Sequence, residues 1–249
     1  MMSSVKGLGA VFLALSVFVA AAGPAQAEEK PDPADVLKKA EAALKQAKVV
    51  RYKFVREGLK ADAEKSPKIT GTVVMSGWYR MFPKRFRLDA VSQQPGATDT
   101  EKLTAGSDGD VFYWFDEKSK KVHADMDPGV FGSRAQSLFD LVVGTYANPD
   151  PFEYEKKAGK IEYKGTSKVG DEECHEIHFV FGEHFEANYF FSIKDSLLKK
   201  FEWTFAQVPG EWSGSRVVLS EVTLDYRPEG DPFKLTVPEG FTKTDEFAP

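Results

Sequence analysis

The sequence predicts an α+β fold in which one antiparallel β-sheet is covered by two helices. Apolar residues recur at helical spacing over 33–49 and again over 133–143. Across most of the chain after residue 50, apolar and polar residues alternate in short runs, which is typical of strands with one buried and one wet face. Because no helices alternate with these strands, the pattern argues against a Rossmann or other parallel architecture.

The composition describes a globular protein and excludes several classes. The chain has 249 residues, of which 42% are hydrophobic, so it is not a disordered chain. With a net charge of −5, the chain lacks the excess of basic residues that is typical of nucleic-acid-binding proteins. Cys174 is the only cysteine, which excludes an intrachain disulfide and any metal site built from several cysteines.

The N-terminal segment has the three parts of a secretory signal peptide. Lys6 precedes the apolar run Leu8–Ala22, and Ala25–Ala27 supplies a small-residue cleavage site. The run is too short for a comfortable membrane span, which needs about 20 residues. We therefore expect a signal peptide at 1–27 and a single soluble domain at 28–249 in the periplasm, without a lipid anchor because no cysteine stands at the junction. The alternative is an uncleaved N-terminal anchor.

The first predicted element of the mature chain is an amphipathic helix over 33–49. Pro33 marks its start and Asp35 is the expected N-cap. Its apolar stripe requires an apolar surface beneath it, and the mixed charge of its polar face favours packing on a sheet over binding at a membrane surface.

The remaining pattern predicts about nine or ten strands joined by hairpins. Phe86 and Leu88 should point to the concave side of the sheet, with Arg85 and Arg87 outward. The last strand of the series is expected at 233–237.

The helical segment at 133–143 interrupts the strands. Ser133 to Gln136 has the form of a capping box, and an unusually apolar body follows it. The segment must cover the apolar face of the sheet or its open end, either as a movable lid or as a structural plug. The lid residues would be Leu138, Phe139, Leu141 and Val142.

Three motifs, taken in order, carry a family resemblance. Residues 78–88 form an aromatic strand that turns at Pro83 and returns through Phe86-Arg87. Residues 107–116 read SDGDVFYWFD, and 233–241 read FKLTVPEGF. This order resembles the LolA/LolB/RseB-like superfamily of periplasmic lipoprotein-binding proteins, over nearly all of the mature chain. One position departs from the family's carrier, which has a lid-latching arginine directly before the hairpin proline. Phe82 stands there in this chain, and the nearest upstream arginine is Arg80.

The resemblance implies a strongly curved, incompletely closed LolA-like half-barrel whose helices cover an apolar cavity for acyl chains. The implied ligand is the acyl chains of a lipoprotein or another hydrophobic molecule, and the implied partners include inner- or outer-membrane sorting proteins. The residues expected to line the cavity are Phe54, Met75, Tyr79, Phe86, Leu88, Phe179, Tyr189, Phe191, Phe201, Trp203 and Leu224. Alternatively, the helices fill the cavity, and the protein is an interaction module of the cell envelope with a filled core.

The sequence gives little support for an enzymatic function. Cys174, Glu176 and His178 share one face of a predicted strand, so a metal site there is geometrically conceivable. Ser213-Gly-Ser215 lacks the frame of a nucleophile elbow, and no phosphate-binding or dinucleotide-binding fingerprint occurs. We expect a non-enzymatic carrier or sensor without a cofactor or a metal.

Overall fold

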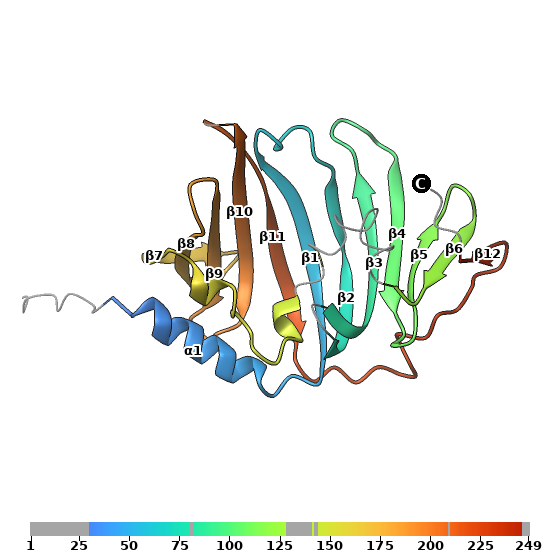
Figure 1. The fold of residues 1–249 in the computed structure, drawn as a ribbon, viewed down its shortest axis with the longest axis horizontal. Helices are drawn as coiled ribbons and strands as arrows, with labels where there is room; N and C mark the ends of the chain where they lie inside the picture. Colours follow the sequence, from blue (N-terminus) through green and yellow to red (C-terminus); the bar gives the residue numbers. More distant parts are fainter. Residues whose placement is uncertain (1–29, 80–81, 128–140, 142–143, 209, 246–249) are drawn as a thin grey trace, which may run out of the picture.

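The computed structural model describes residues 30–79, 82–127, 141, 144–208 and 210–245, with the side chains of Tyr79 and Gln207 outside the description. These residues form a single open sheet of twelve strands, strongly curved and antiparallel except at one edge, and one α-helix that lies along the lower end of the sheet (Figure 1). The predicted fold class, an incomplete half-barrel, is confirmed.

The strands are, in chain order, β1 (Val49–Lys60), β2 (Lys68–Tyr79), β3 (Phe82–Gln93), β4 (Thr100–Ser107), β5 (Phe112–Asp116), β6 (Lys121–Asp125), β7 (Lys160–Val169), β8 (Glu172–Val180), β9 (Phe185–Ser192), β10 (Leu198–Val208), β11 (Glu211–Thr223) and β12 (Thr242–Thr244). Their spatial order is β12-β6-β5-β4-β3-β2-β1-β11-β10-β9-β8-β7. The sheet therefore consists of two meanders, β1–β6 and β7–β11, which meet where β1 pairs with β11. Only β12 runs parallel to its neighbour, β6.

Helix α1 (Pro33–Leu44) is shorter than predicted and begins with a different cap. The N-cap is Asp32, whose carboxylate accepts a hydrogen bond from the Ala34 N–H at 2.8 Å, and Pro33 occupies the first turn. The prediction that Asp35 caps the helix is wrong, because Asp35 lies inside the first turn, where its negative charge interacts favourably with the helix dipole. The chain then leaves the helix early enough for β1 to start at Val49.

One face of the sheet, called the inner face below, carries the main core. It is the face against which α1 packs its buried side chains, including Val36, Leu37 and Ala40. Strands β1 to β5 and β8 to β11 all contribute buried apolar residues to this one cluster. On β3, Phe86 and Leu88 are buried on the inner face while Arg85 and Arg87 are partly exposed on the other, as predicted.

Residues 144–158, called the cover segment below, also lie on the inner face. They include the short 3₁₀ helices η1 (Gly144–Tyr146) and η2 (Glu155–Lys157). The buried Tyr146 hydroxyl donates to the Leu198 carbonyl of β10, and the Phe152 ring meets the Phe191 ring edge-on at 5.4 Å. The cover segment is thus fastened to the β7–β11 half of the sheet.

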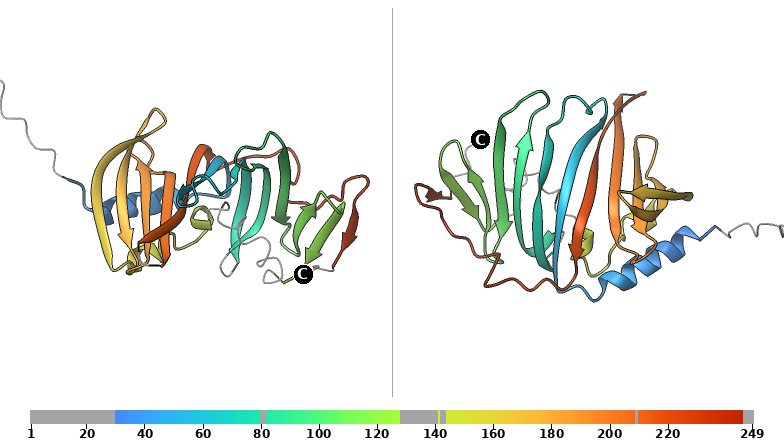
Figure 2. Two further views of the ribbon diagram at one scale, coloured as in Figure 1. Left: turned by 90° about the horizontal axis from the view of Figure 1, so that it is seen from above. Right: turned by 180° about the vertical axis from the view of Figure 1, so that it is seen from behind.

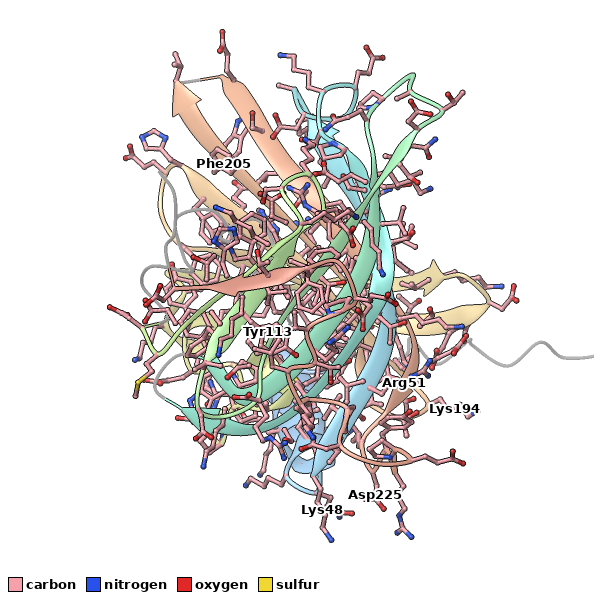
Figure 3. All side chains as sticks on the ribbon, turned by 90° about the vertical axis from the view of Figure 1, so that its right-hand side faces the viewer. Lys48, Arg51, Tyr113, Lys194, Phe205 and Asp225 are labelled. Carbon is pink, nitrogen blue, oxygen red and sulfur yellow. The ribbon has the colours of Figure 1, made fainter. Side chains whose placement is uncertain are left out.

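A second, smaller core lies on the outer face of β5 and β6. It contains Tyr113, Phe115, Val122 and Ala124. Residues 224–241, called the C-terminal strap below, run from the end of β11 in the middle of the sheet to its β12 edge and cover this core (Figures 1 and 2). The Tyr113 hydroxyl, labelled in Figure 3, donates to the Phe233 carbonyl at 3.2 Å.

The strand predicted at 233–237 is wrong, because these residues are irregular and pack as part of the strap. The described residues form twelve strands, whereas nine or ten were expected. The helix predicted at 133–143 lies outside the described residues apart from Leu141, which is fully buried and whose carbonyl accepts from the Tyr52 hydroxyl at 2.8 Å. Within the described ranges, no helix has the length and apolarity to span a membrane.

Candidate hydrophobic ligand site

The structure gathers the side chains that were predicted to line a cavity into one apolar cluster on the inner face. Seven of them are buried there: Phe54, Met75, Phe86, Leu88, Phe179, Phe191 and Phe201. Tyr189, Trp203 and Leu224 are only partly buried and pack against that cluster. Tyr79 ends β2, and its side chain is outside the description. Of the four predicted lid residues, Leu138, Phe139 and Val142 lie outside the described residues.

The aromatic residues of β10 become more exposed from the lower to the upper part of the sheet. Phe201 is buried, its stacked neighbour Trp203 at 5.1 Å is partly exposed, and Phe205 is partly exposed too. Figure 3 shows Phe205 near the upper end of β10, whereas α1 crosses the lower end of the sheet in Figure 1. The upper inner face therefore presents an accessible aromatic surface that continues directly into the buried core.

A pocket of about 380 Å³ opens at the lower end of the inner face. The end of α1, strands β1 and β2 and the start of the cover segment enclose it, and Leu44, Val50, Met75 and Trp78 supply apolar walls. Trp78 was not among the predicted lining residues, since strict alternation with Met75 puts it on the opposite face. Gly77 has a positive φ of 64°, and this irregularity in β2 brings Trp78 and Met75 to the same pocket.

A second pocket, of about 650 Å³, shares Trp78 as a wall. Its apolar lining comes from Val111, Phe112 and Met126, and Met126 is 79% exposed. Lys84 and Asp110 are among its polar lining residues. Trp78 thus borders both pockets, and their volumes are in the usual range for small-molecule sites.

Buried polar groups fix the cover segment above β9. The Tyr189 hydroxyl donates to the carboxylate of the buried Glu155 at 2.6 Å. Burial raises the pKa of Tyr189 well above its ordinary value, and the negative charge of Glu155 adds to the shift. The phenol therefore keeps its proton and remains a hydrogen-bond donor to Glu155 at neutral pH.

The strand that was considered for a metal site does not supply one. Among the described residues, no group of three or more His, Cys, Asp or Glu side chains could hold a metal ion. The His178 Nδ1 atom lies 2.9 Å from the Asn188 Oδ1 atom, and Glu176 accepts a hydrogen bond from Ser167 at 2.6 Å. These contacts tie β8 to its two neighbours in the sheet.

Cys174 should resist alkylation in the folded protein. Its side chain is fully buried, and burial, followed by the charge of Glu172, raises the pKa of its thiol to about 11. Since the thiolate is the reactive form, iodoacetamide should label Cys174 only after denaturation, as measured by intact mass with and without urea. Rapid labelling under native conditions would contradict the burial of this side chain.

The fold of this chain is similar to the folds of several proteins of known structure. No protein-family model matches the sequence, and no curated protein matches it. An uncharacterized conserved protein from Thermus thermophilus has a TM-score of 0.48 at 9% identity, over 85% of this chain and 97% of that chain. LprF from Mycobacterium bovis has a TM-score of 0.44 at 10% identity, over 84% and 98% of the two chains. A LolA superfamily protein from Nitrosomonas europaea has a TM-score of 0.33 at 11% identity, over 80% and 96%. These similarities concern the fold alone.

Proposed function

We propose that the inner face binds the acyl chains of a lipoprotein or another hydrophobic ligand, and that the protein is a non-enzymatic carrier or sensor. The observation that carries this proposal is the partly exposed aromatic surface of Tyr189, Trp203 and Phe205, which is continuous with the main apolar core. The pockets beside Trp78 extend the same apolar surface toward the other half of the sheet.

A hydrophobic ligand gains binding free energy on such a surface because it removes apolar area from water. Full burial of one large apolar side chain stabilises by about 1.5–3 kcal/mol relative to exposure. Tyr189, Trp203 and Phe205 are only partly buried, so part of this gain is still available to a ligand, and the ligand's own chain adds about 0.8 kcal/mol for each CH₂ group that it buries.

The alternative function is that of an envelope interaction module with a filled core. Burial favours a filled core at three positions of the inner face, because at most 1% of each side chain is exposed at Phe86, Phe179 and Phe191. The two functions make different predictions for the partly exposed aromatics, which contact a ligand only in the first.

Tryptophan quenching by a brominated fatty acid tests the proposal. The purified chain, stripped of lipid, is titrated with the fatty acid in wild-type form and in the variants Trp203→Ala and Trp212→Ala. Trp212 is the matched control, because it lies on the adjacent strand β11 but pairs with Ala206 on the outer face. We expect saturable quenching that Trp203→Ala weakens and Trp212→Ala leaves unchanged in affinity. Absence of saturable quenching, together with no co-purifying lipid in native mass spectrometry, would favour the interaction module.

We also propose that the chain is exported and that residues 1–27 are removed. The positive, apolar and small-residue segments before Glu28 support this proposal. Expression with the native leader in a bacterium should yield a periplasmic protein whose intact mass corresponds to a chain that starts at Glu28. A mature protein that keeps Leu8–Ala22 would contradict it.

A further inference from the structure

Arg56 is a charged residue in the middle of the apolar inner face. On β1 it follows Tyr52 and Phe54 at a spacing of two residues, so it shares their face. Its direct neighbours across the sheet are Ile69 of β2 and Val217 of β11, which are 3% and 0% exposed.

The guanidinium of Arg56 has no partner among the described residues. Its Nε atom is buried without a hydrogen bond, and no carboxylate forms an ion pair with it in those ranges. Every other arginine that the structure describes has a carboxylate oxygen at 3.6 Å or less, namely Arg51, Arg85, Arg87, Arg216 and Arg227. Arg56 as a whole is only partly buried, so its unpaired donors are accessible to an anionic ligand, while the buried Nε atom lacks the hydrogen bond that such a ligand would supply.

A second unsatisfied polar group lies beside it. Ser215 of β11 is 1% exposed, and its Oγ atom is buried without a hydrogen bond. Val217 is directly opposite Arg56, so Ser215 is its diagonal neighbour on the same face, opposite Gly58. The carboxylate of Asp62, on the adjacent turn, accepts a hydrogen bond from the Gly214 N–H and makes no ion pair with Arg56.

The aromatic surface starts immediately next to these two groups. In the rows across the sheet, Val217 pairs with Phe201 and Ser215 pairs with Trp203. The next strand continues these rows with Tyr189 and Ala187. These two polar groups therefore border the aromatic surface of β10 and β9 on the side where β1 pairs with β11.

We infer that Arg56 and Ser215 form the head-group subsite for an anionic amphiphile, a single acyl chain with a carboxylate or phosphate head. The guanidinium presents a planar fork of donors that matches carboxylate and phosphate oxygens, and the serine hydroxyl adds one donor. The inference rests on the proposed function, since it assigns the ligand class to the same inner face. It adds that the site selects for the charge of the head group as well as for the chain.

The test compares ligands that share a chain and differ in the head. Palmitate, hexadecanol and hexadecyl phosphate each displace Nile red from the lipid-free full-length mature chain. The variants are Arg56→Gln, Ser215→Ala and the control Arg216→Gln, which removes an arginine that pairs with Glu202 instead. Melting temperatures show that each variant is folded, and Arg56→Gln should not lower stability because it removes an unpaired charge.

We expect wild type to prefer the two anionic ligands over hexadecanol by about 10- to 100-fold, the usual effect of hydrogen bonds to a charged group. Arg56→Gln should abolish this preference and leave hexadecanol affinity unchanged, Ser215→Ala should reduce it, and Arg216→Gln should preserve it. A ranking of palmitate against hexadecyl phosphate identifies the head group. Equal binding of all three ligands, unaffected by Arg56→Gln, would overturn the head-group subsite and leave the proposed function standing. Binding of none of them would overturn the proposed function itself, and with it the subsite.

Discussion

Replacing Phe86 with alanine should lower the free energy of unfolding by about 3–5 kcal/mol, the range for truncating a buried phenylalanine. Phe86 is 1% exposed, and its ring lies 6.4 Å from that of Phe112, so the substitution leaves a sealed void in the main core. Urea denaturation with an unchanged m-value measures the loss.

The control for this substitution is Val91→Ala on the same strand. Val91 is 40% exposed, so its truncation should change stability by no more than about 0.5 kcal/mol. A loss for Phe86→Ala as small as that of the control would show that Phe86 borders an open cavity, and the ligand site would then extend to β3.

Truncating Phe233 to alanine should also cost about 3–5 kcal/mol and should loosen only one end of the sheet. Phe233 is 3% exposed, the Arg85 guanidinium lies over its ring at 4.6 Å, and its carbonyl accepts the Tyr113 hydroxyl. Loss of the ring removes the contact with Arg85 and weakens the attachment of the strap next to β5. Hydrogen exchange should therefore accelerate in β5 and β6 while β8 to β10 keep their protection.

Val237→Ala provides the matched control within the strap. Val237 is 38% exposed, so its truncation should leave both stability and exchange near the wild-type values. Uniform acceleration across all strands in Phe233→Ala would contradict a local role for the strap.

The sequence predicted the parts of the fold whose two faces differ in polarity. Phe86 and Leu88 alternate with Arg85 and Arg87, and the structure places each pair on the expected face. Helix α1 was recognisable for the same reason, although its end was placed too late and its cap at Asp35 instead of Asp32. In these elements, local pattern and tertiary packing agree.

The predictions failed where a strand is apolar on both faces or where alternation has another cause. In β5 the sequence FYWFD places Phe112 and Trp114 in the main core and Tyr113 and Phe115 in the outer one, so periodicity does not identify a single face. In the strap, Phe233 and Leu235 alternate with polar residues although they pair with no strand: Leu235 packs against the outer core, and the Phe233 ring is buried under the Arg85 guanidinium.

The candidate site was predicted in its apolar part and missed in its polar part. Aromatic residues on one strand parity pointed to Phe201 and Trp203, which the structure places together. Arg56 could have been noticed as a charge at an apolar position of β1. Its lack of a partner depends on pairing with β11, which is distant in sequence. Trp78 was missed because the irregular backbone at Gly77 changes which side of β2 faces the pocket.

The seam between the two meanders has a kinetic consequence. Each meander forms from hairpins between neighbouring segments, but the seam joins Val55 to Val218 and Phe54 to Leu219. Contacts between such distant segments require a large loop to close and form slowly. While the chain is being synthesised, β1 has no partner on that side until nearly the whole polypeptide has emerged, and an unpaired strand edge invites aggregation. The slowest folding phase of this protein should therefore be the joining of two preformed half-sheets, and it should slow further when the β1–β11 contact is weakened.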